Sequence, residues 1–206
     1  MDASHTETWD AIYAKHGGRH WPCEPLVSFV RRVYGPLPPE VRRGLRAVEL
    51  GSGIGNNLWF LLDEGFQVAG IEPSTEARFM CIEYLMMRQA GGYLLESRPW
   101  PPWRGEFDLV VDVTTLQHLS ERSHRAALEW IRNVLVPGGR FWSLRLGEGT
   151  DYTELFPENP PVWLGSITAV AAQVIGAGFT TCDITRLERE YTGGLWARYL
   201  CVEART

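Results

Sequence analysis

This 206-residue chain contains, at positions 48–57, the segment Val48-Glu49-Leu50-Gly51-Ser52-Gly53-Ile54-Gly55-Asn56-Asn57. The segment overlaps Leu45–Leu50, a short apolar run of the kind found in buried strands. Residues 57–64 then place leucines at the i, i+3, i+4 spacing of a helix, and Gly65 stands where a helix can end with a positive φ. A strand, a glycine loop and a helix in this order let the backbone approach an anionic or sugar-bearing ligand closely, because glycine has no Cβ.

The spacing of the glycines argues against a nicotinamide dinucleotide as that ligand. A dinucleotide-binding loop has the pattern G-x-G-x-x-G. Counted from Gly51 and Gly53, the third glycine position is occupied by Asn56, and the actual third glycine, Gly55, comes one residue early. The loop therefore favours a different nucleotide-like ligand.

Strands and helices alternate after the loop. Gln67–Ile71 has the pattern of a second strand, and Ser74 or Thr75 can cap a helix whose apolar face continues to Gly91. Alternation of this kind predicts a parallel sheet.

The second half of the chain continues this pattern. Tyr93–Glu96 predicts a weak third strand and Phe107–Val113 a clear fourth strand. The next helix carries Leu128, Ile131 and Leu135, and we expect Pro137-Gly138-Gly139 to end it before a fifth strand, Arg140–Leu146.

The two ends of the chain are predicted to differ from this alternation. Ser166 can cap a last helix, and the strand-like stretches Phe179–Glu188 and Leu195–Glu203 are joined by a turn too short for anything but an antiparallel pair. Residues 1–40 have helical spacing and precede the segment of prolines and glycines at 35–44. We expect them to form a helical lid on a single domain spanning 1–206.

Composition excludes several classes of partner. The 25 acidic and 20 basic residues give a net charge of −5, without a basic stripe for nucleic acid. No apolar run approaches the ~20 residues of a membrane helix, and the N-terminus is polar, so a soluble cytoplasmic protein is expected. The four cysteines are widely spaced without a C-x-x-C pair, which predicts neither a metal site nor a disulfide framework.

Four segments together resemble the motifs of class I S-adenosylmethionine-dependent methyltransferases. They are the acid-Leu-Gly-x-Gly-x-Gly run at 49–55, Val68–Ser74, Phe107–Asp112 and Leu135–Phe141, in the order the family requires. The resemblance covers residues 45–146 closely. It implies an α/β fold: a Rossmann-like three-layer α/β/α sandwich with a seven-stranded, mostly parallel sheet whose last strand is antiparallel. Residues 45–146 would be the cofactor-binding core and 147–206 the substrate side.

The resemblance also implies S-adenosyl-L-methionine as cofactor and a set of residues around it. Glu72 resembles the acid that accepts the ribose hydroxyl protons, a bidentate arrangement that a charged acceptor strengthens. Glu49 resembles the acid that holds the loop and the amino-acid end of the cofactor. The full set of cofactor-binding residues expected is Glu49, Gly51, Ser52, Gly53, Gly55, Asn56, Glu72, Pro73, Glu96, Ser97, Asp112, Val113 and Thr114.

Two parts of this set have particular roles. Glu96 and Ser97 are the candidates for the adenine end, because the family often has an acid after the third strand. Asp112, Val113 and Thr114 resemble the end of the fourth strand that borders the transferred methyl group, where ligands bind beyond the carboxyl ends of the strands.

Catalysis by this family needs little beyond alignment of the acceptor and exclusion of water, so a base is optional. His118 is the first candidate base because it directly follows the fourth strand, although a histidine at this place is common in the family without being catalytic. Tyr13 is the second catalytic candidate, since lids in similar enzymes often place a tyrosine near the cofactor, but Trp9 and Tyr13 at i, i+4 are also ordinary packing residues.

Other residues are weaker candidates for the walls of the site. Arg19 and Arg145 are either carboxylate clamps or surface charges. The remaining candidates around the cofactor are His20, Trp21, Glu24, Tyr152, Glu154 and Trp163.

The predicted reaction is methyl transfer to an oxygen or nitrogen of a small molecule, by a monomer or homodimer. The alternatives are a protein or peptide methyltransferase and a catalytically inactive, methyltransferase-like binding module. DNA amino-methylation is disfavoured because Asp112-Val113-Thr114-Thr115 lacks the D/N-P-P-Y sequence that holds a flipped base.

Overall fold

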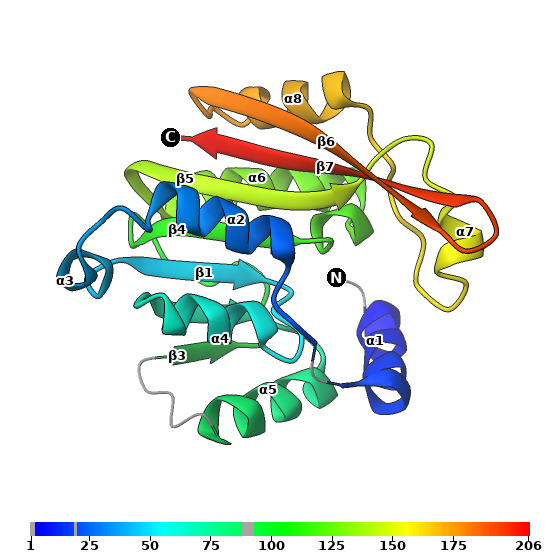
Figure 1. Cartoon of the computed structure of the whole chain (residues 1–206), viewed down its shortest axis with the longest axis horizontal. Helices are drawn as coiled ribbons and strands as arrows, with labels where there is room; N and C mark the ends of the chain where they lie inside the picture. The colour runs from blue at the N-terminus through cyan, green and yellow to red at the C-terminus, as the bar shows by residue number, and fades with distance from the viewer. Residues whose placement is uncertain (1–2, 19, 88–92) are drawn as a thin grey trace.

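The computed structural model describes residues 3–18, 20–87 and 93–206, which fold around one mixed sheet (Figure 1). The sheet has seven strands in the order β3-β2-β1-β4-β5-β7-β6. The strands are β1 (Arg46–Leu50), β2 (Gln67–Ile71), β3 (Tyr93–Glu96), β4 (Phe107–Val113), β5 (Leu135–Leu146), β6 (Thr181–Tyr191) and β7 (Leu195–Arg205). Only β7 runs against its neighbours β5 and β6, which confirms the predicted sheet.

Helices cover both faces of the sheet. They are α1 (Ala3–His16), α2 (Glu24–Val33), α3 (Pro39–Arg42), α4 (Asn56–Asp63), α5 (Thr75–Met87), η1 (Leu116–His118), α6 (Glu121–Val134), α7 (Tyr152–Leu155) and α8 (Ile167–Gly176). Residues of α6 and α8 belong to one buried cluster, and residues of α2, α4 and α5 belong to the other. The predicted three-layer α/β/α sandwich is confirmed. Within the described ranges, none of these helices is long and apolar enough to cross a lipid bilayer.

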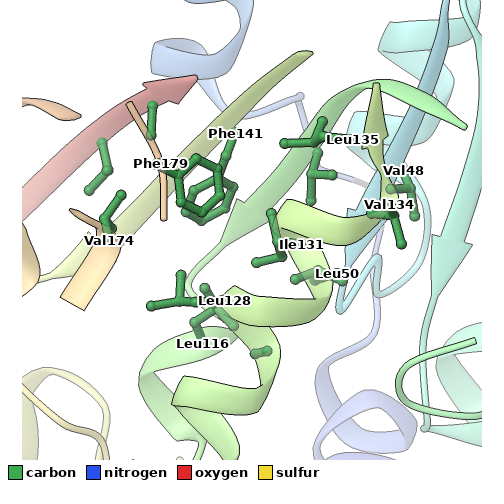
Figure 2. Packing of buried hydrophobic residues seen from close by; sticks show 14 of the residues in the cluster. Val48, Leu50, Leu116, Leu128, Ile131, Val134, Leu135, Phe141, Val174 and Phe179 are labelled. Carbon is green, nitrogen blue, oxygen red and sulfur yellow. The ribbon is translucent and has the colours of Figure 1, made fainter. Parts of the chain in front are cut away.

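Burial on both faces explains why the residues of β1 other than Arg46 and Glu49 are apolar. Val48 and Leu50 pack into the cluster under α6, and Ala47 beside Val48 packs into the cluster under α4. Figure 2 shows the first of these clusters, with Ile131 of α6 beside the strands and the rings of Phe141 and Phe179 together. A strand covered on both faces has no polar alternation.

The parallel register brings the carboxyl ends of three strands to one edge. Leu50 at the end of β1 pairs with Ile71 of β2 on one side and with Asp112 of β4 on the other. The loops that follow these strands therefore meet, as expected for the ligand-binding edge of such a sheet. In Figure 1, α1 lies beyond this edge.

The boundary between α6 and β5 differs from the prediction. The helix α6 ends at Val134 and β5 begins at Leu135, so Pro137-Gly138-Gly139 lies inside the strand and the prediction that it ends the helix is wrong. Leu135 already pairs with Phe107, and the register shifts before the next pair at Leu109, which lets an irregular strand hold a proline and a left-handed glycine. The predicted continuation of α5 to Gly91 lies outside the described residues.

The predicted helix caps are present. The Ser166 hydroxyl accepts from the N–H of Ala169 at 3.2 Å, and the Ser74 hydroxyl accepts from that of Ala77 at 3.1 Å. The two helices of the predicted lid have different surroundings, because α2 buries Leu26 and Val30 completely against the sheet while α1 packs against α5. Within this segment, α1 and the link to α2 are therefore the parts that border the site.

Candidate functional site

The glycine loop between β1 and α4 has a backbone that other residues adopt only with strain. Gly51 and Gly53 have φ values of 60° and 52°, and the Gly51 N–H donates to the Ile71 carbonyl at 2.7 Å. A Cβ on Gly51 would collide with the side chain of Thr115, and one on Gly53 would lie 2.7 Å from the Tyr13 hydroxyl oxygen. The loop thus needs glycine both for its turn and for close approach.

A cavity of about 340 Å³ opens beside this loop. Its volume lies at the lower end of the roughly 300–1,000 Å³ typical of small-molecule sites. It is lined by Trp9, Ile12, Tyr13, His16, Gly17, Gly18 and His20 from the N-terminal segment, by Glu49, Gly51, Ser52, Gly53, Ile54, Asn56 and Asn57 from β1 to α4, and by Val113 and Asn159. The cavity therefore joins the predicted lid to the predicted cofactor loop.

Glu49 places a buried carboxylate with one vacant oxygen on the cavity wall. The residue is 1% exposed, and its Oε1 accepts from Asn57 Nδ2 at 2.7 Å. Its Oε2 is buried without a hydrogen-bond partner among the described residues. Burial raises the pKa of Glu49 to about 8, against the lowering effect of the Asn57 bond and with a further rise from Asp112 and Glu72. A cationic ligand group at Oε2 would compensate this burial.

Glu72 lies at the end of β2 directly beneath the loop. Its Oε2 accepts from the Gly53 N–H at 2.9 Å and its Oε1 from the Ser74 N–H at 2.8 Å. Burial raises the pKa of this carboxyl, while the two backbone bonds oppose the rise. Because a carboxylate has about four acceptor positions, each oxygen keeps one beyond these bonds, and Glu72 itself is not among the residues that line the cavity.

Asp112 is used inside the protein, and its side chain does not line the cavity. The residue is fully buried; Oδ1 accepts from the N–H groups of Thr115 and Leu116, each at 3.0 Å, and Oδ2 accepts from the Ser143 hydroxyl at 2.6 Å. These bonds hold η1 against the end of β4. The neighbouring Val113 does line the cavity.

Arg145 belongs to the same buried network, so the expectation of a surface charge is wrong. It is 0% exposed, and its Nη2 donates to the Ser143 hydroxyl at 3.2 Å. Its Nη1 lies 3.0 Å from Nε2 of His124, whose pKa is lowered to about 3 by burial and by the Arg145 charge. His124 is therefore neutral and accepts this hydrogen bond. The other predicted clamp, Arg19, lies outside the described residues.

Thr114 has a left-handed backbone, with φ of 58°, at the point where the chain leaves β4. Its N–H donates to the Leu144 carbonyl at 2.7 Å, so the pairing of β4 with β5 continues to the end of β4. A β-branched residue rarely adopts this conformation, and such strain is concentrated at ligand-binding sites.

The two predicted catalytic residues meet around Trp9. The His118 ring lies edge-on to Trp9 with centroids 5.2 Å apart, and Tyr13 lies 6.0 Å from the same ring. Burial, followed by the charges of Glu72 and Glu49, raises the pKa of Tyr13, so this phenol stays protonated and acts as a hydrogen-bond donor. The i, i+4 spacing of Trp9 and Tyr13 predicted that the two side chains lie on one face of a helix. Nothing in the sequence indicated that Trp9 lines the cavity.

The predicted adenine-end residues lie outside the cavity. Glu96 accepts from the N–H groups of Ser97 and Arg98 and from the Arg98 guanidinium, which lowers the pKa of Glu96 to about 2. The Glu96 carbonyl accepts from the Glu72 N–H at 3.0 Å, so the two strand ends are adjacent. Pro73 lines a separate small cavity of about 20 Å³ together with Gly51 and Trp100.

Polar contacts that the sequence did not suggest hold the N-terminal segment over the site. Asp10 accepts from the Ser74 hydroxyl at 2.6 Å, and Glu158 pairs with Lys15 at 2.6 Å and with His16 at 2.8 Å. Of the weaker candidates, Trp21 is 88% exposed, the Tyr152 hydroxyl donates to the Pro160 carbonyl, and Trp163 contacts His124.

The sheet order, the reversed last strand and the acid-flanked glycine loop define a Rossmann-like fold of the class I methyltransferase type. Residues 47–139 match the family model described as a methyltransferase domain. This central part, just under half of the chain, is therefore similar to methyltransferase domains.

Individual relatives show the same similarity. An uncharacterized methyltransferase of Geobacillus kaustophilus is 32% identical over 102 residues, 48% of this chain and 46% of the relative, so the match spans about half of each protein. Phosphoethanolamine N-methyltransferase 2 of Haemonchus contortus, in complex with S-adenosyl-L-methionine, superposes with a TM-score of 0.72 at 14% identity over 98% of this chain and 57% of that one.

A second solved structure extends the likeness of fold to both termini. The 1,6-didemethyltoxoflavin-N1-methyltransferase of Burkholderia thailandensis, with bound 1,6-didemethyltoxoflavin and S-adenosylhomocysteine, has a TM-score of 0.69 at 20% identity. The superposition covers 98% of this chain and 88% of that one. The described segments outside residues 47–139 thus have counterparts in the fold.

Proposed function

We propose that this protein transfers a methyl group from S-adenosyl-L-methionine to an oxygen or nitrogen of a small molecule. The observation that carries the proposal is the vacant, buried Oε2 of Glu49 on the wall of the cavity beside the glycine loop. The cofactor carries an ammonium group, which can donate a charge-assisted hydrogen bond to such an oxygen. Similar proteins from Haemonchus and Burkholderia bind this cofactor or its demethylated product.

The chain supplies groups for the amino-acid end and for the ribose of the cofactor. Glu49 would hold the ammonium group, and the open acceptor positions of Glu72 would receive the ribose hydroxyls. Because Gly51 and Gly53 have no Cβ, their backbone leaves room for the ligand between Glu49 and Glu72. When bound, S-adenosylmethionine supplies a methyl group on a sulfonium, which leaves by in-line displacement.

The remaining walls would orient the acceptor and exclude water. Trp9, Ile12 and Val113 present apolar surface to the cavity, while Asn159 and His20 present groups that can form hydrogen bonds. This mixture fits a small acceptor that carries an apolar or ring portion and few polar groups. If the acceptor is a hydroxyl, His118, which contacts Trp9, is the candidate to take its proton.

Calorimetric titration with S-adenosylhomocysteine tests the cofactor part of the proposal. The wild type should bind, and Glu72→Ala should lose binding while its circular dichroism stays native, because the ribose loses its acceptor. Glu129→Gln, on the exposed side of α6, is the matched control and should bind like the wild type. A folded wild-type protein that binds neither S-adenosylhomocysteine nor S-adenosylmethionine would refute the proposal.

The acceptor requires a second experiment. Native and denaturing mass spectrometry of the protein incubated with cofactor and a metabolite extract should reveal a small-molecule product heavier by one methylene. A methylene gained by protein would instead favour the protein methyltransferase. Cofactor binding without any methylated product would favour the non-catalytic binding module.

A further inference from the structure

Asn57, in the first turn of α4, joins the cofactor-site acid to the N-terminal segment. Its Nδ2 donates to Glu49 Oε1 at 2.7 Å, and its Oδ1 accepts from the backbone N–H of Cys23 at 2.8 Å. Cys23 is the residue that precedes α2. One amide therefore bridges the floor of the cavity and the start of the buried helix.

The hydrogen bonds at its two ends determine the orientation of the Asn57 amide. An asparagine amide has one donor end and one acceptor end. Turning the side chain over would place its NH₂ against the Cys23 N–H and its oxygen against the Glu49 carboxylate, and both contacts would be repulsive. The bond to Cys23 consequently depends on the state of the Glu49 carboxylate.

Described residues between α1 and α2 form part of the cavity wall. Gly17, Gly18 and His20 line the cavity, and the His20 N–H donates to Asn56 Oδ1 at 3.3 Å. Two neighbouring asparagines of α4 thus hold two backbone N–H groups of this link. Its position over the cavity follows from the orientation of their side chains.

We propose that Asn57 is a positioning residue that couples occupation of Glu49 by the cofactor's ammonium group to closure of residues 20–23, of which His20 lines the cavity, over that cavity. The inference rests on the proposed function. A cation at Oε2 keeps the carboxylate charged, and a charged acceptor strengthens the bond from Asn57 and with it the orientation that holds Cys23. Because such coupling is reciprocal, closure of the wall also raises affinity for the cofactor.

Hydrogen exchange with S-adenosylhomocysteine as the probe tests the coupling without any turnover. In the wild type, the ligand should slow exchange in a peptide containing His20 and Cys23. Asn57→Leu removes both hydrogen bonds of the bridge without adding charge. We expect affinity for S-adenosylhomocysteine to fall about tenfold, the effect of one hydrogen bond to a charged group, and the slowing to disappear.

A conservative variant separates coupling from general damage. Burial raises the pKa of Glu49 to about 8, and a second carboxyl beside it raises that pKa further, so in Asn57→Asp at pH 7 the two carboxyls share a proton. The carboxyl at position 57 can then donate to Glu49 and still accept from Cys23. The ratio of variant to wild-type dissociation constants should therefore return toward one, and the slowing of exchange should reappear. The other titratable groups with electrostatic influence at Glu49 are common to both proteins: Asp112, Glu72, Tyr13, Cys23 and Cys81.

A matched control completes the experiment. Asn133→Asp, on the exposed side of α6, should behave like the wild type. The coupling is overturned if the wild type binds the ligand but exchange at 20–23 is unchanged, if Asn57→Leu responds as the wild type does, or if Asn57→Asp behaves like Asn57→Leu. Failure of the wild type to bind overturns the proposed function itself.

Discussion

Replacing Glu49 by glutamine removes a buried acid while keeping an oxygen that can accept from Asn57. Glu49 is 1% exposed, and its pKa rises from an ordinary value of 4.5 to about 8 in the fold. A carboxyl with a raised pKa contributes stability that is present below its unfolded pKa and is lost as the pH rises to the folded pKa. The ligand-free wild type should therefore lose stability between pH 4.5 and 8, and Glu49→Gln should lose less.

The size of this effect follows from the two pKa values. A rise from 4.5 to about 8 corresponds to at most about 5 kcal/mol between the ends of the window. Urea unfolding of both proteins at pH 4.5, 6 and 8.5, without ligand, measures it. The variant should gain on the wild type steadily across this range, reaching a few kcal/mol at pH 8.5. A difference in unfolding free energy that does not change with pH would refute the reasoning, and a variant that still binds S-adenosylhomocysteine normally would remove Glu49 from the site.

Three further substitutions test other parts of the site. Gly53→Val should abolish S-adenosylhomocysteine binding in calorimetry with native circular dichroism, because its Cβ meets the Tyr13 hydroxyl; undiminished affinity would contradict the loop geometry. Arg145→Met should destabilise the protein by about 3–5 kcal/mol in urea unfolding, since it leaves buried Asp112 without its charge partner; a neutral effect would show that the network has no such dependence. Thr114→Gly should relieve left-handed strain and gain about 1 kcal/mol in the same assay, whereas a loss would show that the side chain matters more than the backbone.

The sequence alone was sufficient for the framework of the protein. Apolar runs and helical spacing are local patterns, so they predicted the strand order along the chain, the reversed terminal pair and the cap at Ser166. The glycine loop could be predicted equally well, because a left-handed backbone restricts the residue type at the position itself. The family motifs then indicated which edge of the sheet should carry the site.

Contacts between distant segments were decided only by the tertiary structure. No local pattern indicates that Asn57 bridges Glu49 and Cys23, or that Arg145 is buried beside Ser143 and His124. The start of β5 at Leu135 belongs to the same group, since a proline and two glycines normally end an element, and pairing with Phe107 overrides that preference. Hydrogen bonds and burial depend on which groups the packed fold brings within about 3 Å, and that information is shared among segments far apart in the chain.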